Sequence, residues 1–104
     1  MIPYGKQDIN QADINSVIDV LSSDTLTQGP QVPVFEKIVA GYCGAEFGIA
    51  VNSATSALHI ACLSLGLGSG DWLWTSPNSF VASANCGLYC EAKIDFVDID
   101  PRTY

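Results

Sequence analysis

The sequence predicts an α/β fold in which two helices lead into parallel strands that alternate with further helices. Apolar residues before residue 46 recur at helical spacing, whereas after it short apolar runs alternate with longer helical patterns. Clusters of Gly, Ser, Asn and Pro separate these segments. A β-α-β-α-β order of this kind implies parallel strands joined by crossover helices.

The first predicted helix covers residues 10–21. Ile14, Val17, Ile18 and Leu21 stand at positions i, i+3, i+4 and i+7, which is the pattern of an amphipathic helix. The following segment, SDTLTQGPQ, has turn-forming residues and no apolar period. It is therefore expected to be an exposed loop.

A second helix is predicted from Val32 onward, with Gly44 placed to end it. Its apolar face would carry Val32, Phe35, Val39 and Tyr42. We therefore divide the chain into a helical lead-in with an exposed loop, residues 1–45, and the start of an α/β domain, residues 46–104.

Strands and helices alternate through the second part of the chain. The expected order is strand FGIAVN (47–52), helix SATSALHIACLSLG (53–66), strand WLWTS (72–76), helix VASANCGLYC (81–90) and strand KIDFVDID (93–100). The charge-free stretches 47–70 and 72–90 are interrupted by polar residues, Gly or Pro, so we interpret them as buried strand–turn–helix units and not as membrane spans.

Composition narrows the classes of partner. The net charge is −7 with only four basic residues, which argues against a nucleic-acid partner because phosphate binding needs clustered cations. The N-terminus has no signal-peptide pattern, so a cytoplasmic protein without a membrane partner is expected. Hydrophobic residues make up 48% of the chain, which predicts that part of its surface packs against something else.

The four cysteines are expected to be reduced thiols. Cys86 and Cys90 would share one helical face, but a zinc site needs two further ligands and only His59 is available. We therefore expect small, buried apolar residues in place of a metal site.

Candidate chemistry lies where predicted strands lead into helices, because ligands of open α/β sheets bind at the carboxyl ends of the strands. At residues 52–56, hydroxyl side chains at a helix N-terminus suit an anion such as phosphate. Spacing alone favours the alternative, in which Ser53 or Thr55 is a simple helix cap. His59 is expected to pack within its helix. Asp95, Asp98 and Asp100 are expected to form a solvated strand end and turn, and neither acid–base chemistry nor a metal site is assigned to them.

An ordered series of motifs resembles the N-terminal part of the DegT/StrS family of sugar aminotransferases. The motifs are MIPYGKQDI, LTQGP, AVNSATSALHIAC, the segment GD-W-TSP-SFVASANC-LYC, and IDFVDIDP. The resemblance covers essentially the whole chain, and within the family it is strongest to enzymes that aminate a UDP-linked 4-keto-6-deoxy sugar on the route to pseudaminic acid. It implies the large domain of the aspartate-aminotransferase-like (type I) fold, pyridoxal 5'-phosphate as cofactor, glutamate as amino donor and a homodimer.

The resemblance also implies roles for individual residues. Thr55 and Ser56 match positions that hold the cofactor phosphate, which reverses the preference for a simple cap. Phe80 matches the aromatic residue that stacks on the pyridine ring. The positions that match the lining of the sugar-nucleotide site are Tyr4, Asp24, Thr25, Leu26, Thr27 and Ala54.

No catalytic residue is assigned within the chain. In the family a lysine forms the Schiff base and an aspartate pairs with the pyridine nitrogen, and both are expected beyond Tyr104. We therefore expect an N-terminal portion of an aminotransferase that is inactive by itself. Two alternatives stay open: a portion of a related sugar dehydratase, in which histidine replaces the lysine, or a non-catalytic binding or regulatory module that docks through its apolar surface.

Overall fold

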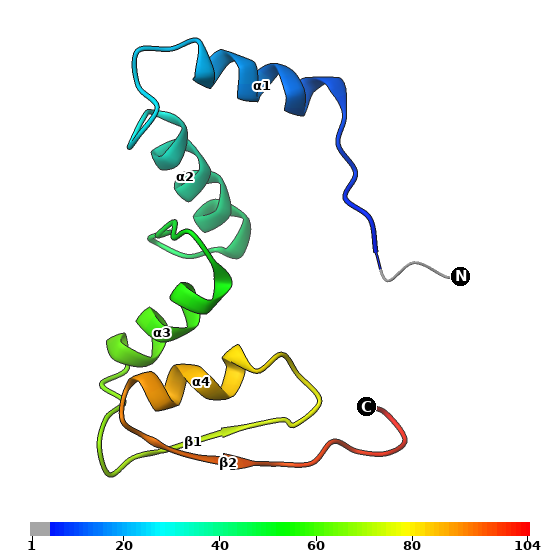
Figure 1. Ribbon diagram of the computed structural model, residues 1–104, viewed down its shortest axis with the longest axis vertical. Helices are drawn as coiled ribbons and strands as arrows, with labels where there is room; N and C mark the ends of the chain where they lie inside the picture. The colour runs from blue at the N-terminus through cyan, green and yellow to red at the C-terminus, as the bar shows by residue number, and fades with distance from the viewer. Residues whose placement is uncertain (1–4) are drawn as a thin grey trace. The chain divides into compact units, whose positions relative to one another are not determined.

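The computed structural model describes residues 5–104, so Tyr4 lies outside the described residues. The chain forms two compact units, the first ending at Ala50 and the second spanning Val51–Tyr104, and each is described by itself. The elements, labelled in Figure 1, are α1 (Gln11–Leu21) and α2 (Gln31–Cys43) in the first unit, and α3 (Ala54–Ser64), β1 (Trp72–Thr75), α4 (Ala82–Tyr89) and β2 (Lys93–Phe96) in the second.

Helix α1 confirms the predicted helix over residues 10–21. Asn10 is its N-cap, and its side-chain oxygen accepts hydrogen bonds from the backbone N–H groups of Ala12 at 2.8 Å and Asp13 at 3.3 Å. The Asp13 carboxylate accepts in return from the Asn10 N–H at 2.9 Å, which completes a capping box. Local sequence therefore determines where this helix begins.

Helix α2 confirms the second predicted helix, and Gly44 ends it in the left-handed conformation with φ 65°. The strand predicted over residues 47–52 was wrong, since these residues join no sheet. A strand needs a neighbouring strand to bond its backbone. Here the Ala50 N–H donates instead to the half-buried Glu36 carboxylate of α2 at 2.8 Å.

The second unit contains the predicted parallel strand pair. β1 and β2 are parallel, in a register that runs from Trp72 opposite Lys93 to Thr75 opposite Phe96, with α4 as the helix that connects them. The last predicted strand ends at Phe96 and not at residue 100. Beyond it, the side chain of Asp98 accepts from the Ile99 N–H at 2.8 Å, a local bond that competes with sheet pairing.

Helix α4 lies along one face of the strand pair (Figure 1) and contacts both strands. Gly87 marks the closest approach: a Cβ atom built there would lie 2.5 Å from Ile94 Cδ1 and 2.9 Å from Leu73 Cδ2. Leu73 and Ile94 are half-buried beneath the helix. The missing side chain of Gly87 therefore allows the helix to reach the strands.

Among residues 5–104, the buried ones are all small. They are Ala40, Cys62, Ala82, Cys86, Cys90 and Ala92, together with the Gly87 backbone. The predicted burial of the WLWTS strand was wrong, because Trp72 is 56% and Trp74 is 67% exposed. Leu58 and Ile60 of α3, also expected in the core, are exposed. A chain this short has too few layers to cover such large side chains.

None of the helices in the described residues is both long enough and apolar enough to cross a bilayer. The fold class predicted from the sequence is confirmed in its helix–strand alternation, although the described sheet has two strands instead of three.

Cys62 of α3 packs against Cys86 and Cys90, with Leu67 and Leu73 around them. All four cysteines are free thiols, and burial of these three confirms the prediction, whereas Cys43 is exposed. Loss of hydration raises the pKa of the Cys62 thiol to about 11, and the adjacent Cys86 and Cys90 add to this effect. The buried thiols therefore hold α3 and α4 together as small apolar groups.

We predict that Gly87→Ala destabilises the second unit by about 1–3 kcal/mol, since the new methyl overpacks against Leu73 and Ile94. Gly41→Ala is the matched control, because a Cβ added to this helical glycine would meet no atom within 4 Å. It should be neutral or stabilising by up to about 1 kcal/mol. Denaturant unfolding followed by circular dichroism, which reports the helices of both units, measures both substitutions, and equal effects of the two would contradict the packing argument.

A second prediction concerns thiol reactivity. In the folded chain at neutral pH, a maleimide should modify Cys43 rapidly and Cys62 far more slowly, because the thiolate is the reactive form and Cys62 keeps its proton. The reactivity of Cys62 should rise as the pH approaches about 11, where its thiol ionises. Peptide mapping identifies the modified residues, with urea-unfolded protein as the control. If Cys62 were labelled as fast as Cys43 in the native chain, the prediction would be contradicted.

Candidate functional site

The first turn of α3 gathers hydroxyl groups around a helix N-terminus. Ser53 is the N-cap, and its Oγ accepts from the Ser56 N–H at 3.2 Å. The Ser56 hydroxyl donates to Asn52 Oδ1 at 2.9 Å and lies 3.0 Å from the Ser53 hydroxyl. Asn52 belongs to the stretch 52–56 that the sequence singled out, although no role was assigned to its side chain. Three side chains thus support one another around this turn.

The cap leaves room for an anion at the same turn. Within the described residues, the hydrogen bonds of this turn provide no acceptor for the backbone N–H groups of Ala54 and Thr55. These groups carry the partial positive charge of a helix N-terminus. Thr55 is half-buried in the first turn, and its hydroxyl makes no hydrogen bond to another described residue. A helix cap and an anion site are therefore compatible here: Ser53 caps, and Ala54 and Thr55 keep free donors.

Phe80 lies where the strands end. It lines a cavity of about 210 Å³ together with Thr75 and Phe96, which are the last residues of β1 and β2. The other lining residues are Ser76, Pro77, Ser79, Val81, Ser83 and Ala84. Phe80 is 75% exposed, so its ring is open to a flat partner. The cavity stands at the carboxyl ends of parallel strands, the position where α/β sheets bind ligands.

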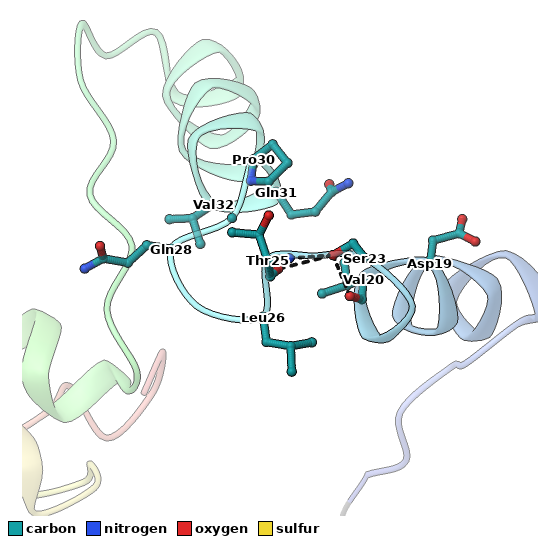
Figure 2. Close-up of a pocket in the computed structure, with 10 residues that line it drawn as sticks. Asp19, Val20, Ser23, Thr25, Leu26, Gln28, Pro30, Gln31 and Val32 are labelled. Carbon is teal, nitrogen blue, oxygen red and sulfur yellow. Dashed lines mark hydrogen bonds between the residues drawn. The ribbon is translucent and has the colours of Figure 1, made fainter.

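The loop between α1 and α2 surrounds a second cavity, of about 160 Å³ (Figure 2). Thr25 and Leu26 line it, whereas Asp24 and Thr27 are absent from its lining. The Ser23 hydroxyl orders the loop by donating to the Val20 carbonyl at 2.7 Å and accepting from the Thr25 N–H at 3.3 Å. The rest of the lining, which the sequence did not single out, is Asp19, Val20, Ser23, Gln28, Gly29, Pro30, Gln31 and Val32.

His59 and Asp100, which the sequence also offered for consideration, make contacts that stabilise the local structure. His59 is half-buried and its ring lies 5.3 Å from that of Tyr89, which confirms that it packs within the helix layer. The Asp100 carboxylate accepts from the Arg102 N–H at 2.8 Å and pairs with its guanidinium at 3.6 Å. Among the described residues, no group of three or more His, Cys, Asp or Glu side chains has the geometry to hold a metal ion.

Known proteins resemble this chain in sequence. The model of the DegT/DnrJ/EryC1/StrS aminotransferase family matches residues 7–104. The chain is 41% identical over 99 residues to UDP-4-amino-4,6-dideoxy-N-acetyl-beta-L-altrosamine transaminase of Campylobacter jejuni, covering 95% of this chain and 26% of that protein. It is 40% identical over 102 residues to spore coat polysaccharide biosynthesis protein SpsC of Bacillus subtilis, covering 98% and 26%.

Solved structures resemble it as well. PseC of Helicobacter pylori, an aminotransferase involved in the biosynthesis of pseudoaminic acid, matches with a TM-score of 0.87 and 33% identity, over 94% of this chain and 27% of that one. Spr1654 from Streptococcus pneumoniae, in its PLP form, matches with a TM-score of 0.90 and 31% identity, over 98% and 26%.

The chain thus spans about a quarter of the length of these relatives. The sequence match covers most of the chain, and the structural match agrees with its order of helices and strands. The chain therefore belongs to the DegT/DnrJ/EryC1/StrS aminotransferase family, and its fold is that of an N-terminal portion of the sugar aminotransferases in this family.

Proposed function

We propose that the protein carrying this chain is a pyridoxal-phosphate-dependent aminotransferase that transfers an amino group to a nucleotide-linked keto sugar. The first turn of α3 is the observation that carries the proposal, because it offers unpaired N–H groups beside hydroxyl side chains. The names of the sequence relatives support a sugar substrate, and the PLP form of Spr1654 supports the cofactor.

The residues present fit the phosphate of pyridoxal phosphate. The N–H groups of Ala54 and Thr55 would donate to its oxygens, and the Thr55 and Ser56 hydroxyls would add donors from the same turn. Small side chains at residues 53–56 let a tetrahedral anion approach the backbone. The chain has only four Lys and Arg residues and a net charge of −7, so basic side chains contribute little to binding an anion. The helix terminus itself would supply the positive potential.

Phe80 would hold the flat ring of the cofactor in place by stacking, which fits its exposure in the loop between β1 and α4. When bound, the cofactor supplies an electron sink for the amino-group transfer. The lysine that binds it covalently is not assigned to Lys6, Lys37 or Lys93. We therefore propose that these 104 residues bind and orient but do not catalyse by themselves.

The loop between α1 and α2 would contribute to binding the sugar nucleotide. Thr25 provides a hydroxyl and Leu26 an apolar surface at its cavity, and Asp24 and Thr27 belong to the same loop. Ala54, with its small side chain, would form the wall beside the cofactor phosphate. Tyr4 completes the proposed set from outside the described residues.

Our more specific proposal is a UDP-linked 4-keto-6-deoxy sugar of pseudaminic acid biosynthesis as acceptor and glutamate as donor. The Campylobacter jejuni transaminase and the Helicobacter pylori PseC support this substrate class. We further propose a cytoplasmic homodimer. The many large apolar side chains exposed on both units leave surface available for such packing.

Thr55→Ala should weaken cofactor binding about ten- to a hundredfold in the complete protein, since it removes a hydrogen bond to a charged phosphate. Equilibrium titration with pyridoxal phosphate, followed by absorbance, measures the dissociation constant. Ser64→Ala is the matched control, because this hydroxyl lies at the other end of α3 and donates to the Ala61 carbonyl. Equal affinity of the Thr55→Ala variant and the unmodified protein would show that the Thr55 hydroxyl does not bind the cofactor phosphate.

The complete protein should convert a UDP-linked 4-keto-6-deoxy sugar and glutamate into the amino sugar and 2-oxoglutarate, detected by mass spectrometry. Thr25→Ala should raise KM for the sugar several-fold, because the loop loses a hydroxyl at its cavity. Ser16→Ala on the exposed surface of α1, where the hydroxyl bonds only the Ala12 carbonyl, is the control. A deoxygenated product without transferred nitrogen would instead identify a sugar dehydratase.

A further inference from the structure

The backbone of Gln28, in the loop between α1 and α2, has a left-handed conformation that residues with a side chain rarely adopt. Its φ angle is 50°, and among the described non-glycine residues only Glu91 and Tyr104 also have positive φ. Glycine adopts this conformation without strain, whereas a Cβ atom makes it unfavourable. The loop therefore holds Gln28 in a strained conformation.

The positive φ of Glu91 has a structural reason that Gln28 lacks. Glu91 directly follows Cys90, the C-cap of α4, and with φ 61° it stands where helices commonly end in a left-handed residue. Gln28 lies at no helix C-terminus, since α1 ends at Leu21 and α2 begins at Gln31. A strained residue that no helix end explains is a candidate for a functional role.

The loop folds tightly beside Gln28 and keeps it in this conformation. A Cβ atom built at Gly29 would lie 3.0 Å from the Thr25 carbonyl oxygen. The Gln28 side chain extends away from Ser23 and Thr25 (Figure 2), and it makes no hydrogen bond to another described residue. Its amide therefore keeps two donor hydrogens and an acceptor oxygen for a ligand.

The cavity that Gln28 lines has polar groups but no cation. Its volume of about 160 Å³ is below the usual size of a pocket that encloses a whole ligand, so it suits one part of a sugar nucleotide. The polar lining residues are Asp19, Ser23, Thr25, Gln28 and Gln31, and the lining includes no Lys or Arg. A carboxylate repels a diphosphate, whereas hydroxyl and amide groups exchange hydrogen bonds with sugar hydroxyls. The lining therefore favours the uncharged sugar portion over the diphosphate.

We propose that Gln28 is a specificity-determining residue that recognises the sugar portion of the substrate through its side-chain amide. The inference rests on the proposed function, which supplies the sugar nucleotide as substrate. A sugar hydroxyl both donates and accepts hydrogen bonds, so it can pair with either end of the Gln28 amide.

Backbone strain and ligand binding respond in opposite directions when this side chain is removed. In the complete protein, Gln28→Gly should raise the melting temperature by about 1–4 °C, because glycine relieves the strain. It should raise the dissociation constant of the UDP-linked 4-keto-6-deoxy sugar about three- to tenfold, because the amide is lost. The dissociation constant of UDP, which has no sugar beyond its own ribose to bind here, should stay unchanged. Calorimetric titrations without an amino donor measure both constants, and differential scanning calorimetry measures the melting temperature.

Glu91→Gly is the matched control, because it relieves the same kind of strain at a residue that does not line the cavity. It should raise the melting temperature to a similar extent and leave sugar binding unchanged. Gln28→Asn keeps an amide on a residue type that tolerates positive φ, so it should recover part of the sugar affinity lost in Gln28→Gly.

Three results overturn the inference. Unchanged sugar affinity of Gln28→Gly means that the amide does not bind the sugar. A melting temperature that falls together with the affinity gives Gln28 a structural role only. An equal loss of UDP affinity assigns Gln28 to the nucleotide portion.

Failure of the proposed function gives a different result. A sugar nucleotide that binds without accepting an amino group would contradict the aminotransferase and leave the Gln28 comparison intact, since that comparison measures binding. If the unmodified protein bound no sugar nucleotide, both proposals would be overturned.

Discussion

The close approach of α4 to the strand pair at Gly87 is the contact on which the second unit depends. The helix can lie against Leu73 and Ile94 only because residue 87 has no side chain. This contact holds β1 and β2 parallel beneath their connecting helix, although a pair of strands has little stability of its own. It thereby brings the carboxyl ends of both strands to the same edge, beside Phe80.

Helix α4 also anchors α3, whose first turn is the other candidate site, through contacts between cysteine side chains. Cys86 and Cys90 of the α4 segment pack against Cys62 of α3, so that two strands and two helices form one layered unit. Thiols are small enough to allow close helix packing, and the Cys62 thiol, whose pKa is raised to about 11, stays uncharged at neutral pH. Helix α3 is thus held at Cys62, away from its first turn. The N–H groups of Ala54 and Thr55 in that turn keep no hydrogen-bond acceptor among the described residues.

Much of the candidate site was predictable because it is local. A Ser cap, a helix start and free N–H groups depend on a few consecutive residues, so residues 52–56 could be identified as a turn suited to an anion. Spacing alone favoured a cap and the family resemblance favoured a phosphate site, whereas in the structure Ser53 caps while Ala54 and Thr55 keep free donors. The lining of the α1–α2 loop cavity was mostly missed, since it depends on how the loop folds back.

The sequence by itself determined the four helices and the β1 strand, because apolar period, caps and turn residues act over neighbouring positions. Only the tertiary structure decided what depends on distant partners. Residues 47–52 bond to α2 instead of a strand, β2 ends early, and Trp72 and Trp74 stay exposed although their strand reads as apolar. Strand pairing and burial depend on groups that are far away in the chain. A local sequence pattern shows only that a segment is suited to pair or to be buried, not that a partner is present.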